Sequence, residues 1–239
     1  MSDEVSIDAS NLEAMRAATH YQAAMLALVQ EALGPTAGPI ADFGAGEGNY
    51  AAKLQAAMPR TKIVCVEPDS ALTARYPATL AHVSRVDALP SASLAAAYSL
   101  NVFEHIDDDA HALAALATRV APGGKLFILV PAHMSLWTAM DDAVGHKRRY
   151  TANSLFRLAQ DAGLRVLSAG WFDQTGYLAA KATRLLERLG LPVTDNGRIT
   201  ARQVRTFDRL FALLEPILNK LTCLPGKNRW VLVEKPCGR

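Results

Sequence analysis

Three glycines at alternate positions follow a short apolar run that ends near an acid. The acid is Asp42 and the glycines are Gly44, Gly46 and Gly48, within IADFGAGEGN (40–49). Glycine lets a ligand approach the backbone closely and permits positive φ angles. A helix N-terminus adds unpaired N–H groups and a partial positive charge. The stretch therefore predicts a loop that holds a cofactor between a strand and a helix.

A second acid, Glu67, follows the apolar run KIVCV (62–66). A carboxylate at the tip of the second strand can accept hydrogen bonds from both hydroxyls of a ribose. Dinucleotide folds use G-x-G-x-x-G, and that pattern placed on Gly44 and Gly46 puts Asn49 where the last glycine should stand. The loop and Glu67 thus predict a bound nucleoside, and the spacing fits less well with a pyrophosphate.

Polar residues also follow the next two apolar runs. The third run ends in Asp87-Ala88-Leu89-Pro90, and the fourth ends in Asn101, which precedes VFEHIDDD (102–109). We expect all of these positions at the carboxyl ends of parallel strands, where open α/β sheets bind ligands.

The elements that must position these residues alternate along the chain. Apolar runs without polar alternation, separated by helical patterns, predict an α/β fold with a parallel sheet covered by helices. The expected strands are 39–43, 62–66, 81–86, 94–100 and 124–130, and the expected helices between them are 48–58, 69–76 and 108–120.

The flanking regions have a different pattern. An Ala- and Leu-rich segment that stops at Gly34-Pro35 predicts a helix over 11–33. After the core, the sequence predicts a helix over 152–162, a strand over 164–172, helices over 175–189 and 202–221, and a final strand over 229–235. The two long helices are an insertion or cap before the last strand. Their apolar stripes favour packing on the sheet, and peripheral membrane contact of 202–221 is the alternative.

Composition limits the function classes. The chain has 239 residues and a formal charge of +2, so we expect one domain and no nucleic acid partner. The polar start predicts no secretory signal, and no apolar run reaches the ~20 residues that span a bilayer. Three scattered cysteines predict reduced thiols, with Cys65 in the core, and a cytoplasmic location. The sequence does not indicate an oligomeric state.

These segments together resemble the class I S-adenosylmethionine-dependent methyltransferases, in the subgroup of small-molecule and biosynthetic enzymes. The order and spacing agree over roughly residues 38–170 and not in 1–33 or 173–228. The matching stretches are IADFGAGEG (40–48), VEPD (66–69), VDALP (86–90), YSLNVFEHIDD (98–108) and APGGKLFILVPA (121–132), and DDAVGHKRRYT (141–151) resembles a further segment of that subgroup.

The resemblance implies a fold and a division of the chain. The fold is a Rossmann-like, mostly parallel, seven-stranded sheet flanked by helices, with the last strand antiparallel. The whole chain, 1–239, forms a single domain. Its expected parts are an N-terminal helical cover (1–36), the cofactor-binding core (37–172), the helical insertion (173–228) and the final strand (229–235).

The resemblance also implies that S-adenosylmethionine is the cofactor and S-adenosylhomocysteine the product. Asp42, Gly44, Ala45, Gly46 and Gly48 would line the methionine end. Glu67 would bind the ribose hydroxyls, with Pro68 beside it. Asp87 would approach the adenine amino group and Ala88 the ring, while Asn101 and Val102 would close the pocket under the methyl donor.

Residues near the expected acceptor side could take part in chemistry. For a hydroxyl acceptor, His105 or His146 would serve as general base, because histidine titrates near neutral pH. His133, Arg149 and Tyr150 would bind the small-molecule acceptor, with Arg149 gripping an anionic group. His133, Asp141, Asp142 and His146 have ligand-type side chains, but their loose spacing predicts no metal site.

Two other classes of function stay open from the residues alone. A nicotinamide-dependent oxidoreductase is disfavoured by Asn49 and by the lack of a Tyr-x-x-x-Lys stretch. A non-catalytic protein that binds S-adenosylmethionine and a partner is disfavoured by the intact loop and Glu67. The stretch Ser99-Leu100-Asn101-Val102 stands where adenine or glutamine-amide methyltransferases carry Asn-Pro-Pro-Tyr, which argues against those acceptors. Oxygen, nitrogen and carbon remain as target atoms.

Overall fold

The structure is a computed structural model that describes residues 14–190, 200–221 and 224–237. The described residues divide into two compact units. Unit 1 comprises the residues up to Met25 together with Pro131–Tyr150 and Trp171–Arg229, and unit 2 comprises Leu26–Val130, Thr151–Gly170 and Trp230–Arg239. The segment 131–150 thus groups with the inserted helices, whereas the predicted subdivision placed it in the cofactor-binding core.

The predicted seven-stranded, Rossmann-like sheet is confirmed. Its strands run in the order β3-β2-β1-β4-β5-β7-β6. Strands β1 to β5 pair in parallel, and β7 lies antiparallel between β5 and β6. The strands are β1 (Ile40–Phe43), β2 (Ile63–Val66), β3 (Ala81–Val83), β4 (Leu94–Leu100), β5 (Val120–Pro131), β6 (Arg165–Phe172) and β7 (Asn228–Glu234).

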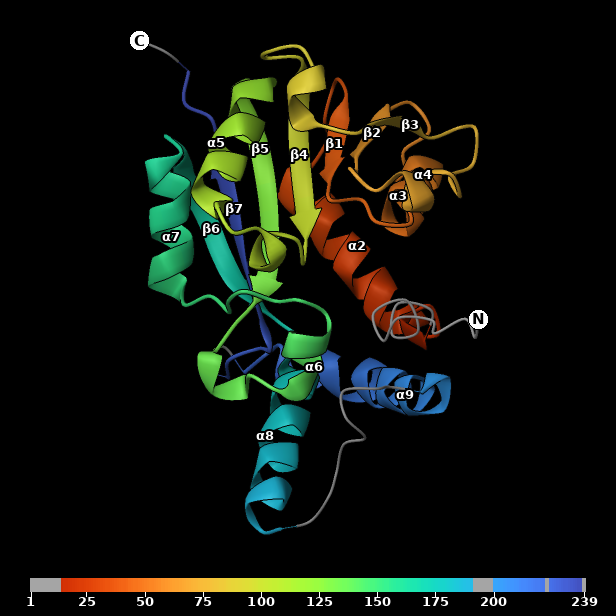
Figure 1. Cartoon of the computed structure of the whole chain (residues 1–239), viewed down its shortest axis with the longest axis vertical. Coiled ribbons are helices and arrows are strands. Elements are labelled where there is room, and N and C mark those ends of the chain that lie inside the picture. Colours follow the sequence, from red (N-terminus) through yellow and green to blue (C-terminus); the bar gives the residue numbers. More distant parts are fainter. Residues whose placement is uncertain (1–13, 191–199, 222–223, 238–239) are drawn as a thin grey trace, which may run out of the picture. The chain divides into compact units, whose positions relative to one another are not determined.

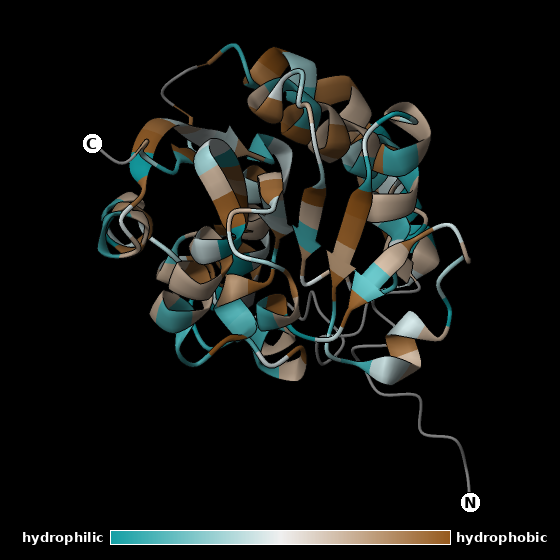
Figure 2. Cartoon of the chain, turned by 90° about the horizontal axis from the view of Figure 1, so that it is seen from above, coloured by the Kyte–Doolittle hydropathy of each residue, from teal (hydrophilic) through white to brown (hydrophobic). Residues whose placement is uncertain are grey.

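Helices flank this sheet (Figures 1 and 2). The helices of the described residues are α2 (Thr19–Leu33), α3 (Asn49–Ala57), α4 (Ser70–Thr73), α5 (Asp109–Arg119), α6 (Ala139–Ala143), α7 (Ala152–Asp161), α8 (Gln174–Arg188) and α9 (Ala201–Leu218), with 3-10 turns η1 (Val86–Ala88), η2 (Phe103–His105) and η3 (Met134–Leu136). Helices α8 and α9 lie between the last two strands in sequence, which confirms the predicted insertion. No described helix is long and apolar enough to cross a lipid bilayer.

The core lies in the central strands. Every residue of β1 and β2 is buried, because strands covered on both faces need no polar alternation. The apolar strand residues are brown in Figure 2. Cys65 is a buried free thiol in β2, as expected for a core residue.

Two element predictions need correction. A continuous helix over 11–33 is wrong in the described part, because a turn at 16–17 precedes α2, which begins at Thr19. Residues 11–13 lie outside the described residues. The physical cause is the carboxylate of Asp208 in α9, which accepts hydrogen bonds from the amides of His20 and Tyr21 and thereby caps a new helix. Strand β3 is shorter than predicted and is followed by η1 at 86–88.

Candidate functional site

The glycine loop of unit 2 follows β1 and leads into α3. Gly44, Gly46 and Gly48 all have positive φ, at 76°, 55° and 73°. A Cβ on Gly44 would lie 2.4 Å from Val102 Cγ2, so the loop packs closely on the residue that follows β4. A Cβ on Gly46 would meet nothing within 4 Å. The loop thus has one glycine that is needed for packing and one that borders open space.

Glu67 ties the tip of β2 to this loop. Its Oε2 accepts from the Gly46 amide at 2.8 Å, and its Oε1 accepts from the Asp69 amide at 3.0 Å. The Tyr76 hydroxyl donates to the Gly46 carbonyl at 2.7 Å and is a second contact that holds the loop. Glu67 is 7% exposed, so it is no solvated strand end. An ionised carboxylate has about four acceptor positions, and the two amides leave capacity for the hydroxyls of a ribose.

Asp42 lies near the end of β1, directly before this loop. It is buried, and its Oδ2 has no hydrogen-bond partner among the described residues. Burial, with a smaller contribution from the negative charge of Glu67, raises the pKa of Asp42 to about 7 against the lowering effect of the nearby Tyr98 hydroxyl, which makes no hydrogen bond of good geometry with any described residue. A buried carboxylate oxygen without a donor is costly. This oxygen therefore fits a site where a ligand supplies the missing partner.

The remaining cofactor candidates lie at the following strand ends. Asn101 has a φ of 55°, and its amide donates to the Leu129 carbonyl, which aligns it with β5. Asp87 lies in η1 and is exposed. Its carboxylate pairs with the Arg85 guanidinium, whose hydrogen bonds lower the pKa of Asp87. Asp87 is thus engaged by an arginine in this structure, and a role beside adenine stays a prediction.

The catalytic candidate of unit 2, His105, is exposed at the end of η2. Its amide donates to the Val102 carbonyl at 3.0 Å, so the turn after β4 fixes the backbone position of His105. Phe103 of the same turn stacks on Phe43, with ring centroids 5.5 Å apart. The turn after β4 is therefore packed against the end of β1, where Asp42 and the glycine loop lie.

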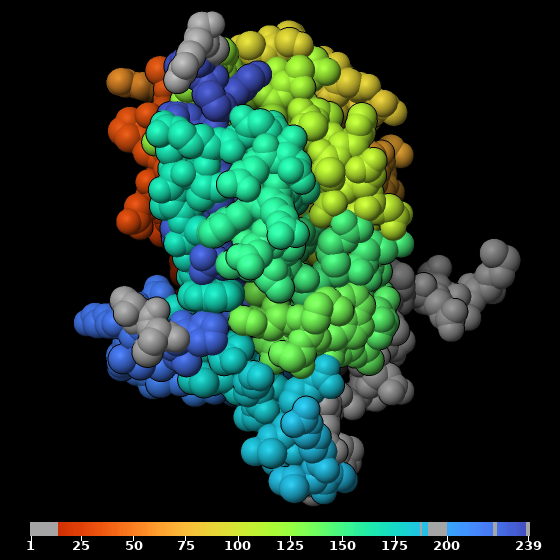
Figure 3. Space-filling view, turned by 90° about the vertical axis from the view of Figure 1, so that its left-hand side faces the viewer, coloured from red at the N-terminus to blue at the C-terminus, as the bar shows by residue number. Residues whose placement is uncertain are grey.

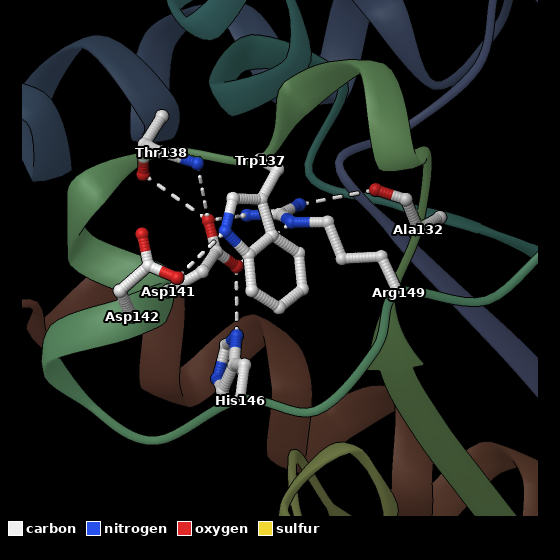
Figure 4. Close-up of polar contacts among 7 residues, drawn as sticks. All are labelled: Ala132, Trp137, Thr138, Asp141, Asp142, His146 and Arg149. Carbon is white, nitrogen blue, oxygen red and sulfur yellow. Dashed lines mark hydrogen bonds and ion pairs between the residues drawn. The ribbon is translucent and has the colours of Figure 1, made fainter.

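Unit 1 contains a second set of candidates in residues 131–150, and Asp141 is at its centre (Figure 4). Its carboxylate accepts from Arg149 Nε at 2.8 Å and from Arg149 Nη2 at 3.1 Å. Arg149 Nη1 donates to the Ala132 carbonyl at 3.0 Å. Each guanidinium nitrogen therefore donates to a protein oxygen, and the side chain is buried. These contacts favour a structural role for Arg149 over the expected grip on an anionic acceptor.

His146 and Thr138 complete the bonds to Asp141. His146 Nδ1 lies 2.7 Å from Asp141 Oδ1, and the amide and hydroxyl of Thr138 donate to Oδ2 at 2.8 and 3.1 Å. Burial alone would raise the pKa of Asp141. The hydrogen bonds from His146 and Arg149 outweigh it and hold the pKa well below its ordinary value. An ionised carboxylate only accepts, so Nδ1 of His146 carries a proton.

The other acceptor candidates are packed into the same unit. His133 stacks on Trp171, with ring centroids 5.0 Å apart, and its Nε2 lies 3.2 Å from the Gly226 carbonyl. Burial lowers the pKa of His133. Tyr150 is 3% exposed, and its backbone pairs with Ala132 in an isolated parallel bridge. Both residues make contacts within unit 1, and their contact with an acceptor stays a prediction.

Sequence reasoning missed two acids of α9. Asp208 and Glu215 are buried and cap the N-termini of α2 and α8, respectively. The available signal was their seven-residue spacing, which places both on the same helix face as the apolar Val204 and Phe211. A separate signal concerned Asp141. The spacing Thr138-x-x-Asp141 is typical of a capping box at a helix N-terminus, here that of α6.

A Rossmann-like sheet whose β1 loop, β2 acid and β4 turn converge defines the nucleoside-binding α/β class. The family model described as a methyltransferase domain matches residues 17–169, more than half of the chain. The chain therefore belongs to this methyltransferase family, whose cofactor is S-adenosylmethionine. The buried, partnerless Oδ2 of Asp42 and the open space at Gly46 fit that cofactor. A search of curated proteins finds no match.

Solved structures with the same fold have low sequence identity. Phosphoethanolamine N-methyltransferase 2 of Haemonchus contortus, in complex with S-adenosyl-L-methionine, has a TM-score of 0.60 and 16% identity, over 92% of this chain and 57% of that one. This chain thus spans little more than half of that enzyme. A SAM dependent methyltransferase from Archaeoglobus fulgidus has a TM-score of 0.59 and 14% identity, over 91% and 94%. The cyclase SpnF has a TM-score of 0.58 and 16% identity, over 90% and 82%.

Proposed function

We propose that the protein is an S-adenosylmethionine-dependent methyltransferase enzyme that acts on a small-molecule or biosynthetic-intermediate acceptor. The observation that carries the proposal is the bond between Glu67 and the Gly46 amide, because it joins the expected ribose-binding and methionine-binding positions of the family. The fold alone would not suffice, since the cyclase SpnF has it too. The reduced cysteines expected from the sequence favour work in the cytoplasm.

The acceptor class rests on the charge balance and on the structural relatives. The Haemonchus enzyme has also been solved with phosphomonomethylethanolamine and S-adenosylhomocysteine, a small acceptor with the spent cofactor. The near-neutral charge of this chain fits a small acceptor better than a long nucleic acid.

The proposed roles follow the geometry of unit 2. Bound S-adenosylmethionine would supply an electrophilic methyl group on a sulfonium. Asp42, Gly44 and Gly46 would hold the methionine end, and Glu67 would hold the ribose. Asn101 and Val102 fix the turn beneath the methyl position. The residues orient the donor and exclude water, which is the main requirement of such a transfer.

For a hydroxyl acceptor, we propose His146 or His105 as the general base. His146 has the better-defined orientation, because Asp141 accepts from Nδ1 and a neutral ring then has its lone pair on Nε2. The arrangement follows the logic by which a buried aspartate fixes the tautomer of a catalytic histidine.

Calorimetric titration with S-adenosylhomocysteine tests the cofactor assignment. The wild-type chain should bind in the micromolar range. The Glu67→Ala variant should lose about 1.5–3 kcal/mol for each hydrogen bond to the charged carboxylate that disappears. Glu31→Ala is the matched control, because Glu31 is an exposed glutamate of α2. Its affinity should equal that of the wild type.

Binding that is unaffected by Glu67→Ala would show that the ribose lies elsewhere. A folded wild-type chain that binds neither S-adenosylhomocysteine nor S-adenosylmethionine would overturn the proposed function. A chain that binds both but turns over no acceptor in a broad panel would support the non-catalytic alternative.

A further inference from the structure

Large apolar side chains are exposed along α8 and α9 of unit 1. On α9 and the residues after it they recur every three or four positions, which places them along one side of the helix. The C-terminal half of α8 (cyan) stands clear of the neighbouring chain on the side shown in Figure 3. The exposed set is Leu178, Leu185, Leu186 and Leu189 from α8 and its end, and Leu210, Leu213, Leu214, Ile217 and Leu221 from α9 and its end.

The opposite side of α9 is anchored in unit 1. Val204, Asp208, Phe211 and Glu215 are its buried residues, and they follow one another at helical spacing. Phe211 packs against Tyr21 with ring centroids 5.1 Å apart. A helix with an apolar inner stripe and a second, exposed apolar stripe has more apolar surface than its own unit covers.

Two buried carboxylates fix the rotation of α9. Asp208 Oδ1 accepts from the Tyr21 amide at 2.9 Å, and its Oδ2 accepts from the His20 amide at 3.1 Å. Glu215 Oε1 accepts from the Gln174 amide and its Oε2 from the Thr175 amide, both at 2.9 Å. A rotation that buried the outer leucines would break both caps. The outward direction of these leucines is therefore built into the unit.

The exposed charges beside the leucines have a single sign among the described side chains, which do not include that of Glu187. The only acids of α9, Asp208 and Glu215, are buried in the two caps, so they do not reach the surface. Among the described side chains of 174–221, every exposed charged one is a cation: Lys181, Arg188, Arg202, Arg205, Arg209 and Lys220.

We propose that the outer faces of α8 and α9, the leucine surface, dock onto an anionic lipid membrane. Apolar side chains would enter the boundary between headgroups and acyl chains, and the surrounding cations would meet anionic headgroups. A second copy of the chain is the poorer occupant, because pairing two such surfaces brings cations against cations. The proposal goes beyond methyl transfer and does not require it.

Co-sedimentation of the full chain with vesicles tests the docking. The chain should bind vesicles that contain phosphatidylglycerol and not vesicles of phosphatidylcholine alone, and binding should weaken as salt rises. The Leu213→Ser/Ile217→Ser double variant should bind about tenfold or more weakly, because these two side chains are 66% and 60% exposed and no longer contribute apolar burial. Met134→Ser/Leu167→Ser is the matched control, with two exposed apolar residues outside α8 and α9.

The charge contribution has its own pair of variants. Arg205→Glu/Arg209→Glu should abolish binding to anionic vesicles, while Arg60→Glu/Lys62→Glu, with the same change in net charge at exposed positions of unit 2, should retain most of it. Absence of vesicle binding, or equal binding by the surface and control variants, would overturn the proposal. Sedimentation velocity decides for a second copy instead if the wild type is a dimer, Leu213→Ser/Ile217→Ser is a monomer, and neither binds vesicles.

Discussion

Asp42 of unit 2 and Asp141 of unit 1 are both buried aspartates, at 3% and 2% exposure, yet their surroundings differ. Asp141 accepts hydrogen bonds from His146, Arg149 and Thr138, and its pKa lies well below the ordinary value. The Oδ2 of Asp42 makes no hydrogen bond of good geometry among the described residues. The nearby Tyr98 hydroxyl only partly offsets burial, which raises the pKa of Asp42 to about 7.

The difference separates a structural acid from an acid that we propose binds a ligand. A buried carboxylate whose oxygens are all engaged stabilises the segment that contains it. A buried carboxylate with an unpaired oxygen lowers stability until something binds it. Burial is common to both residues, so the count of donors, and not burial, identifies Asp42 as the candidate for cofactor contact.

The largest expected effect is on stability. Asp141→Ala leaves the buried guanidinium of Arg149 without its partner, which should cost about 3–5 kcal/mol of unfolding free energy. Urea unfolding followed by circular dichroism measures it. Asp142→Ala is the matched control, since Asp142 is exposed and accepts from Trp137 Nε1, and it should cost less than about 1 kcal/mol. Similar losses for both variants would remove the distinction between the two aspartates.

Unlike Asp141→Ala, the Asp42→Asn variant should weaken cofactor binding without lowering stability above neutral pH. Cofactor affinity should fall by about 1.5–3 kcal/mol through loss of the charge, while stability should hold or rise above neutral pH. The folded-state pKa of about 7 exceeds the ordinary 3.8, so the folded protein binds more protons in that window and loses stability as pH rises through it. The variant should flatten that slope. Unfolding curves at several pH values and calorimetric titration together measure both effects.

The same pKa predicts proton release on cofactor binding. A cationic cofactor group beside Asp42 favours its ionised form, so binding near pH 7 should release up to about half a proton. Titrations in phosphate and Tris buffers reveal this as different apparent enthalpies. Asp42→Asn should abolish the difference. A wild-type enthalpy that is independent of the buffer would place the cationic group away from Asp42.

The smallest expected effects come from alanine substitution at two glycines, one in each unit. Gly46 in unit 2 and Gly145 in unit 1 have φ angles of 55° and 74°, and a Cβ on either would meet nothing within 4 Å. Alanine at either position should therefore cost about 1–2 kcal/mol of stability from backbone strain alone. Only Gly46→Ala should also weaken S-adenosylhomocysteine binding. Equal binding by both variants would show that the space at Gly46 does not hold the cofactor.

The sequence was sufficient for most of the fold because burial on both faces leaves a clear pattern. Strands β1, β2 and β4 contain nearly uninterrupted apolar residues, and their ends coincide with the predicted ones to within one residue. The expected helix over 11–33 failed because the residue that divides it, Asp208, lies almost 190 positions away in sequence. Local propensity contains no information about such a cap.

The site was predicted in part for the same reason. The glycine loop and Glu67 are local signals, and the structure brings them together through the bond from the Gly46 amide, which the sequence did not predict. Their contact with a cofactor stays a prediction. Arg149 looked like an anion-binding residue because sequence alone does not show which oxygens lie near a guanidinium. Its engagement with Asp141 and Ala132 arises from backbone pairing between the segments that precede and follow α6.

The two caps of α9 have a consequence for how this chain tolerates change. Acids on the inner face of α9 cap the first turns of α2 and α8. The three helices should therefore open as a single cooperative element. An insertion of one residue between Asp208 and Glu215 would rotate one carboxylate by about 100° away from its target. Substitutions on the outer face would leave the fastening intact. The inner face of α9 is thus fixed by its packing and its two caps, while residues on its outer face can be substituted without changing the fold of the unit.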